Sequence, residues 1–115
     1  TIDAAANGNK KTALVLLGQH LTQGNSPFYL LTMITYQFRN LLIARDLLDK
    51  GKPLPSIIHA TGWKPFMAQK YYSLVQKFSR PKLKNIYARI LETDLKIKTG
   101  KIDPRRGLEL LIIEI

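Results

Sequence analysis

The sequence predicts an all-α fold, a single compact helical bundle of about five or six helices. Apolar residues recur at intervals of three and four, which is typical of the buried face of a helix. Glycine and proline fall between these periodic segments, and none of the six prolines interrupts an apolar stripe. No Val-, Ile- or Thr-rich stretch alternates with a period of two, apart from an ambiguous C-terminal run. The length of 115 residues, 45% of them hydrophobic, suits one domain with one core.

The first two helices are predicted from their apolar spacing and from the residues at their ends. Residues 10–22 have leucines at helical spacing, and Gly24-Asn25 closes the segment. Ser26-Pro27 suits the N-cap and the first position of a second, longer helix. One apolar stripe continues through residues 27–50, and Gly51 is typical of the position just after a helix end.

The second half of the chain contains shorter segments separated by the same kinds of signal. Residues 56–60 predict a short helix that Thr61-Gly62 ends. Pro65 opens the next helix, which we expect to reach Phe78. The remaining helices are predicted from the restart at Ser79-Arg80-Pro81 to Gly100, and from the Asp103-Pro104 cap to Ile115.

The charge of the chain is strongly positive and unevenly distributed. The formal net charge is +10 and the sequence pI is about 10.0, a balance that predicts an anionic partner. From Lys50 through Arg89 there are nine basic residues and no acidic one, whereas the rest of the chain holds nine basic and eight acidic residues. Candidates for contact with phosphates or with an acidic partner are Lys64, Lys70, Lys77, Lys82 and Lys84.

The residue types that carry most enzyme chemistry are missing or scattered. There is no cysteine, which excludes disulfides, thiol catalysis and Cys-based metal sites and favours a reducing, cytoplasmic environment. No glycine-rich phosphate loop is present, and the two histidines lie in different predicted helices without a nearby ligand. No apolar run reaches the roughly 18 residues that span a bilayer. We therefore expect no catalytic residue, no metal and no cofactor.

One acidic residue lies on the inner stripe of its predicted helix. Asp94 is in register with Tyr87, Ile90 and Ile97, so its carboxylate must be paired or lie at the edge of the core. Either Arg39 or Arg45 on the long helix is the expected partner. We interpret the pairing of Asp94 with one of these two arginines as a structural ion pair that fixes the register of two helices, rather than as a catalytic pair.

A segment in the middle of the chain has the proportions of a helix-turn-helix. Residues 56–60, the turn Thr61-Gly62 and residues 65–78 have suitable lengths. However, Phe66 and its neighbours occupy the region where a base-reading helix carries Arg, Asn or Gln, and only Gln69 is suitable. Ordinary helix packing is the favoured interpretation of the segment. A contact with phosphates is the second interpretation, and the reading of DNA bases is the least favoured.

The last predicted helix is apolar on more than one side. Such a helix is either central in its own domain or buried against another subunit. Protein–protein association is therefore better supported than chemistry. The candidate residues of a subunit interface are Leu110, Ile112, Ile113 and Ile115.

Several segments, in order and with suitable spacing, resemble one known family. They are Lys11–Leu14, the run Tyr-Gln-Phe-Arg-Asn at 36–40, Trp63–Lys70, Leu91–Gly100, and the ending from Ile102-Asp103-Pro104 onward. Together they resemble the C-terminal domain of the delta subunit of bacterial DNA polymerase III, which belongs to the sliding-clamp loader. No single motif is specific, but the ordered set spans nearly the whole chain.

The resemblance implies an assembly role. Delta subunits have two AAA+-like domains followed by a helical collar domain, and the collars of five loader subunits associate in a ring. Delta contacts the sliding clamp through an N-terminal domain that is absent here, and it is not expected to be a working ATPase. No catalytic residue of the family maps onto this chain. Arg39 and Asp94 match the family pattern, and we carry them over only as scaffold residues.

Two hypotheses follow for the function of residues 1–115. The leading hypothesis is an oligomerisation domain, excised from a longer clamp-loader subunit of the bacterial cytoplasm, that binds the collar domains of other subunits. DNA is a non-specific partner in this reading, and a membrane is not a partner. The alternative is a basic helical domain that binds nucleic-acid phosphates through the stretch from Lys50 to Arg89.

Overall fold

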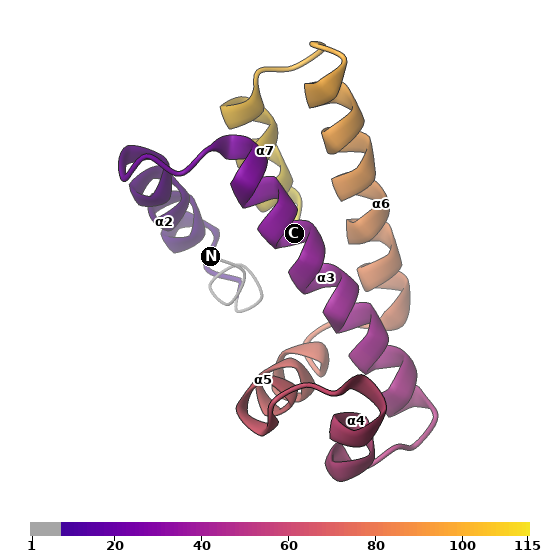
Figure 1. The fold of residues 1–115 in the computed structure, drawn as a ribbon. Coiled ribbons are helices and arrows are strands. Elements are labelled where there is room, and N and C mark those ends of the chain that lie inside the picture. Colours follow the sequence, from indigo (N-terminus) through magenta and orange to yellow (C-terminus); the bar gives the residue numbers. More distant parts are fainter. Residues whose placement is uncertain (1–7) are drawn as a thin grey trace.

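The fold is all-α, as the sequence predicts. A computed structural model describes residues 8–115, and all regular secondary structure within them is helical (Figure 1). The six described helices are α2 (Lys10–Thr22), α3 (Pro27–Asp49), α4 (Leu54–Thr61), α5 (Pro65–Val75), α6 (Arg80–Lys98) and α7 (Pro104–Glu114).

Three of the described helices, α3, α6 and α7, begin at short polar side chains that cap them and are followed by proline. Ser26 accepts a hydrogen bond from the backbone N–H of Phe28, and Ser79 accepts one from Lys82. Asp103 caps α7 in the same way. A proline follows within the first two positions of each of these helices, where its missing N–H is not needed. The capping signals in the sequence are therefore confirmed.

Several helix boundaries differ from the prediction by one to three residues, and two of the differences have a clear physical reason. Helix α5 ends at Val75, three residues before Phe78, because the N–H groups of Lys77 and Phe78 bond to carbonyls three residues back in a tight turn. Helix α4 begins at Leu54 rather than at residue 56. Its first turn accommodates Pro55, since the N–H groups of a first turn have no helical partner.

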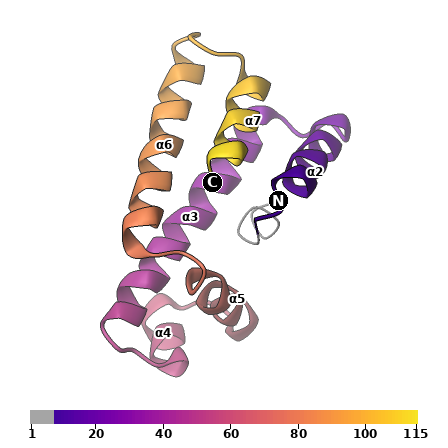
Figure 2. The same ribbon diagram turned by 180° about the vertical axis from the view of Figure 1, so that it is seen from behind.

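Helices α3 and α6 form the central pair of the structure. They run side by side in opposite directions along the long axis of the molecule (Figure 1). Helices α2, α5 and α7 lie on one side of this pair, toward the viewer in Figure 2. Helix α4 lies at the end of the pair where α3 ends and α6 begins. Most of the opposite side of the pair, which faces the viewer in Figure 1, is not covered by any of the described helices.

The core lies between the α3–α6 pair and the helices behind it. The predicted stripe of α3 is buried at Leu31, Ile34, Phe38 and Leu41. The ring of Phe38 meets that of Phe78 edge-on, with centroids 5.9 Å apart, and so joins α3 to the turn after α5. Further core residues come from the other helices and include Ala13, Leu17, Tyr71, Leu83, Ile90, Leu108, Leu111 and Ile112.

One buried polar side chain was not anticipated from the sequence. Asn40 lies on α3 with 5% of its surface exposed, and its Nδ2 donates a hydrogen bond to the Tyr71 hydroxyl at 3.2 Å. Tyr71 in turn packs against Trp63, with ring centroids 5.1 Å apart. The bond satisfies two polar groups in the core and fixes how α5 lies on α3.

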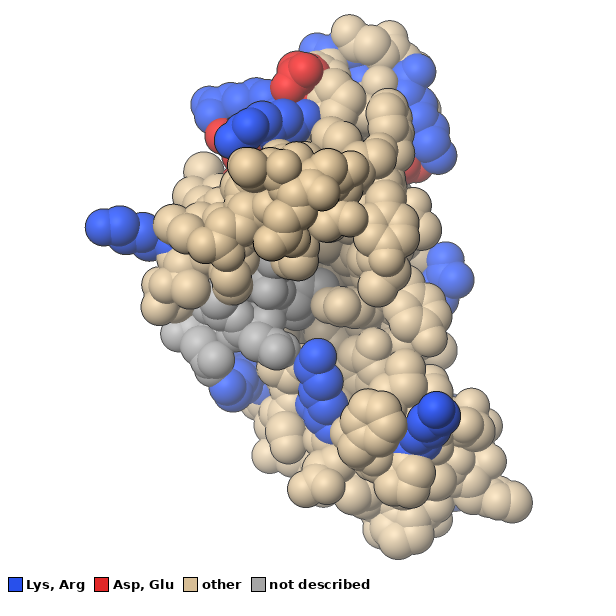
Figure 3. Space-filling model, turned by 60° about the vertical axis from the view of Figure 1, so that its left-hand side comes forward, with Lys and Arg blue, Asp and Glu red and all other residues tan. Residues whose placement is uncertain are grey.

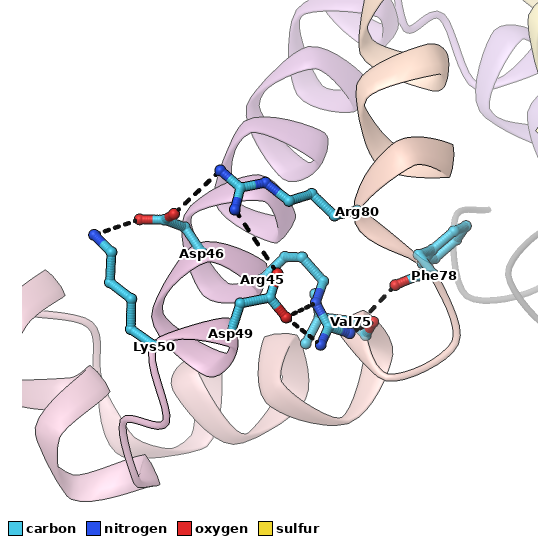
Figure 4. A network of polar contacts seen from close by, with 7 residues as sticks. All are labelled: Arg45, Asp46, Asp49, Lys50, Val75, Phe78 and Arg80. Carbon is cyan, nitrogen blue, oxygen red and sulfur yellow. Dashed lines mark hydrogen bonds and ion pairs between the residues drawn. The ribbon is translucent and has the colours of Figure 1, made fainter.

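A network of charged groups joins the end of α3 to the connection between α5 and α6 (Figure 4). The Arg45 guanidinium donates to Asp49 at 2.6 and 3.0 Å, and its other nitrogen points at the carbonyls of Val75 and Phe78, each 3.4 Å away. Arg80, at the start of α6, pairs with Asp46 at 3.4 Å and reaches Asp49 at 4.0 Å. The carboxylates of α3 therefore hold α6 at its first residue.

Helix α7 approaches α6 closely at a glycine. A Cβ atom at Gly107 would lie 3.0 Å from the Cδ1 of Ile97 and 3.4 Å from the Cγ2 of Thr93. Gly107 is buried, so an added side chain would have to fit against these neighbours. The absence of a side chain at this position sets the distance between the two helices.

We expect Gly107→Val to lower the free energy of unfolding by about 1–3 kcal/mol, because the added methyl groups overpack the contact with Ile97. The measurement is urea denaturation followed by circular dichroism. The matched control is Gly18→Val on α2, where an added Cβ meets nothing within 4 Å. This control should change stability by no more than about 0.5 kcal/mol. Equal effects of the two substitutions would contradict the close-approach explanation.

A second prediction concerns the acidity of Asp49. The hydrogen bonds from Arg45 lower the pKa of Asp49, loss of hydration partly opposes this, and the charges of Arg45 and Arg80 lower the pKa further. Because the pKa is lower in the folded protein than in the unfolded chain, the network stabilises the fold above the unfolded pKa. That contribution is lost as the pH falls through the folded pKa.

An NMR titration of the Asp49 carboxyl group tests this order of causes. In Arg45→Met the pKa of Asp49 should rise markedly. In Arg80→Met the pKa should rise less, because Arg80 is the more distant cation and makes the smallest contribution to the lowered pKa. An equal or larger rise in Arg80→Met would show that the hydrogen bonds from Arg45 do not dominate.

Candidate functional site

Exposed apolar side chains concentrate on helices α3 and α6. Among the described residues, seven of the ten large apolar side chains that are exposed lie on these two helices, so the concentration is not a uniform feature of the surface. They are Phe28, Tyr29, Met33, Tyr36 and Ile43 on α3, and Leu91 and Leu95 on α6. Contiguous exposed apolar surface is typical of a protein–protein contact.

Two hollows follow the seam between α3 and α6. The first has a volume of about 270 Å³ and is lined by α3 residues including Tyr36 and by Leu91, Asp94 and Lys98 of α6. The second has a volume of about 470 Å³ and is lined by Ile43 and its neighbours, by Tyr87, and by the end of α4. Arg39 lines both hollows. We call the two hollows together the α3–α6 groove.

The charged side chains at the two ends of the α3–α6 groove form ion pairs, whereas Arg39 at its middle does not. Asp94 pairs with Lys98 at 2.9 Å. At the other end, Asp46 pairs with Lys50 at 3.1 Å and with Arg80 at 3.4 Å. Within residues 8–115 the exposed guanidinium of Arg39 takes part in no ion pair and no side-chain hydrogen bond. Within the described residues the groove therefore offers apolar side chains, among them Tyr36, Ile43 and Leu91, beside a single cation that lacks a counter-ion.

The residues predicted to form an ion pair lie on facing helices. Arg39 and Asp94 line the same hollow, and Asp94 is partly buried at the edge of the core, as its place on the stripe predicts. The structure gives Asp94 a different partner, Lys98, which lies one turn further along the same helix. The other candidate partner, Arg45, is bound to Asp49.

The five lysines predicted to contact phosphates or an acidic partner are all exposed and lie between the start of α5 and the first turns of α6. Lys64 precedes α5, and Lys82 places its Nζ 5.6 Å from the centre of the Phe78 ring. In the lower half of the face drawn in Figure 3, basic side chains stand apart on an otherwise uncharged surface, and no acidic one is visible. They form no continuous basic patch on that face.

Acidic residues outside the basic stretch neutralise part of it. Three of its nine cations pair with carboxylates that precede or follow the stretch in sequence, which lowers the effective charge available to a polyanion. These cations are Lys50 and Arg80, which pair with Asp46, and Arg89, which pairs with Glu114 at 3.0 Å. Folding therefore reduces the charge asymmetry that is apparent in the sequence.

The predicted interface residues of the last helix divide into two groups. Ile112 and Ile115 are 1% and 6% exposed and belong to the core of the chain itself. Ile113 is 42% exposed, and Leu110 is half-buried. Helix α7 is apolar on more than one side because it is central: it packs against α2, α3 and α6. Leu110 and Ile113 are the two members of the predicted set that a partner can reach.

The histidines and acidic residues considered as metal or catalytic groups do not form a site within the described residues. The hollow beside α2 and the start of α3, about 300 Å³, contains His20 but no carboxylate. Within the described part of the chain, no three His, Asp or Glu side chains cluster as metal ligands do, and no helix is long and apolar enough to cross a membrane. In the segment with helix-turn-helix proportions, Phe66 at the start of α5 is 73% exposed, whereas Ala68 is buried.

The α3–α6 groove was missed by the sequence analysis. The search for helical periodicity finds the stripe that is buried, and Tyr36, Ile43 and Leu91 lie off that stripe. The sequence nevertheless contains a signal of this surface, because the large apolar residues Tyr36 and Ile43 lie seven positions apart and off the buried stripe of the long helix.

The chain matches a known family along its whole length. Residues 1–115 match the sequence profile of the "DNA polymerase III delta subunit, C-terminal domain" family. The chain is 25% identical over 114 residues to DNA polymerase III subunit delta of Bacillus subtilis (strain 168), covering 99% of this chain and 33% of that protein.

A solved structure with the same fold supports the match. The Bacillus subtilis DNA clamp loader delta protein superposes with a TM-score of 0.90 at 25% identity, over 98% of this chain and 33% of that one. The chain therefore spans about a third of the length of the relatives that it matches. Because the family profile covers every residue from 1 to 115, the chain belongs to the family of C-terminal domains from the delta subunit of DNA polymerase III.

Proposed function

We propose that this chain is the helical collar domain of a delta subunit, and that it helps to assemble the clamp loader that places the sliding clamp on DNA during bacterial replication. The observation that carries the proposal is the match of the family profile to all 115 residues. The chain acts in the cytoplasm by binding the collar domains of other clamp-loader subunits. It contributes contacts and no catalytic group to the assembly.

The distribution of apolar surface supports an assembly role. Tyr36, Ile43 and Leu91 line the α3–α6 groove, whereas Leu110 and Ile113 belong to α7, which packs on the other side of the α3–α6 pair. A ring is built from heterologous contacts, in which each subunit uses two different surfaces. Two separate apolar surfaces are what a domain inside such a ring requires.

The alternative, a domain that binds nucleic-acid phosphates through residues 50–89, is less well supported. Three cations of that stretch are engaged with carboxylates, and the basic side chains on the lower half of the face drawn in Figure 3 stand apart from one another. A phosphate-binding surface aligns several cations along the path of the backbone. In our proposal, contact with DNA is non-specific and secondary to binding of the other subunits.

The salt dependence of binding separates the two functions. We expect the chain to bind the other clamp-loader subunits with an affinity that changes little between low and moderate salt, because apolar burial dominates. DNA binding through phosphates would instead weaken steeply with salt, and the double variant Lys64→Glu, Lys84→Glu would abolish it. Isothermal titration calorimetry measures both affinities. A folded chain that bound no partner subunit would contradict the assembly role.

A substitution on α7 tests the predicted interface. Ile113→Gln should weaken partner binding by about tenfold without lowering stability, because the side chain is exposed in the isolated chain. The control is Val15→Gln, which changes another exposed apolar residue, on α2, and should leave the affinity unchanged. Loss of affinity in both variants would indicate a general effect of surface polarity, and loss in neither would remove α7 from the interface.

A further inference from the structure

We propose that the α3–α6 groove binds one helix of a neighbouring clamp-loader subunit, and that this helix presents apolar side chains on either side of a carboxylate that pairs with Arg39. The proposal rests on the assembly role and names the surface and the chemistry of the partner. It concerns a surface that the sequence analysis did not identify.

The length and the lining of the groove suit a helix. The residues of α3 that line it run from Leu31 to Leu47, a rise of about 24 Å at 1.5 Å per residue. That distance accommodates a partner helix of about four turns lying along the seam. Tyr36, Ile43 and Leu91 supply apolar contacts along the groove, and an amphipathic helix inserts its apolar face into such a surface.

The positive charge of Arg39 at the middle of the groove indicates that the partner helix carries a carboxylate there. A partner helix in the groove would remove water from Arg39, and a desolvated cation without a counter-ion is costly. The nearest acidic residue of the lining, Asp94, is already paired with Lys98, and Asp46 is paired with Lys50 and Arg80. The carboxylate must therefore come from the partner, where a bidentate pair with the guanidinium also fixes the register of the helix.

The same charge disfavours two other occupants. In a symmetric dimer of this chain formed groove to groove, a twofold axis through the middle of the groove would bring Arg39 against its own counterpart. A nucleic acid requires several cations in succession, whereas within the described lining Arg39 is the one cation without a carboxylate. A single acidic residue within an apolar helix face fits both features of the groove.

Charge reversal in the groove tests the proposal. We expect Arg39→Glu to weaken binding of the other clamp-loader subunits by about tenfold or more, because two carboxylates would then face each other. Leu91→Gln should also weaken binding, through loss of apolar contact. The matched controls are Lys11→Glu, an exposed cation on α2, and Phe66→Gln, an exposed apolar residue on α5, and both should bind as the unmodified chain does.

A photo-cross-linker at position 36 identifies the occupant. Replacement of Tyr36 by p-benzoylphenylalanine should cross-link the chain to a helix of a partner subunit, and mass spectrometry locates the helix and its acidic residue. Reversal of that acidic residue to Arg should restore the binding of Arg39→Glu. Cross-links only to a second copy of this chain, or unchanged affinity in both groove variants, would overturn the inference while the assembly role survives. Failure of the unmodified chain to bind any of the other loader subunits would overturn both.

Discussion

The burial of one face of α3 is the constraint on which the rest of the structure depends. Helix α3 packs against α5, α6 and α7, and it connects the two ends of the molecule. Its buried stripe is shared: α7 covers the first half, α5 covers the second half, and α6 runs along most of its length. The Asn40–Tyr71 hydrogen bond and the Arg45 network then fix where α5 and α6 lie on the stripe. Because these helices cover one face, the opposite face of α3 stays open.

Most of the fold could be predicted from local signals. Ser26, Ser79 and Asp103 are capping residues whose effect extends only over the next turn, so they can be recognised without tertiary information. The end of α5 could not be predicted, because it depends on Phe78 leaving the helix to meet Phe38, which is 40 residues away in sequence. The buried Asn40 also depends on a tertiary partner, the hydroxyl of Tyr71.

The candidate surface was less predictable than the fold for a physical reason. Periodicity reports which side of a helix is buried, but it does not distinguish burial within the chain from burial against a partner. Ile112 was therefore assigned to an interface although it is a core residue. The groove escaped notice because its two walls come from helices about 50 residues apart in sequence, and their juxtaposition is a property of the folded state. Arg39 could be singled out as charged, but its lack of a counter-ion is visible only in three dimensions.

Helix α3 also has a mechanical property that follows from its sequence. Between Phe28 and Asp49 it contains neither glycine nor proline, and it is clamped at its C-terminal end by the ion pairs of Asp46 and Asp49. Sharp kinks in long helices form mostly at proline or glycine, and α3 has neither over this span. Tyr36 and Ile43 are therefore held about 10 Å apart along the helix axis. If a segment docks in the α3–α6 groove as we propose, the distance between its anchor points has to match this spacing.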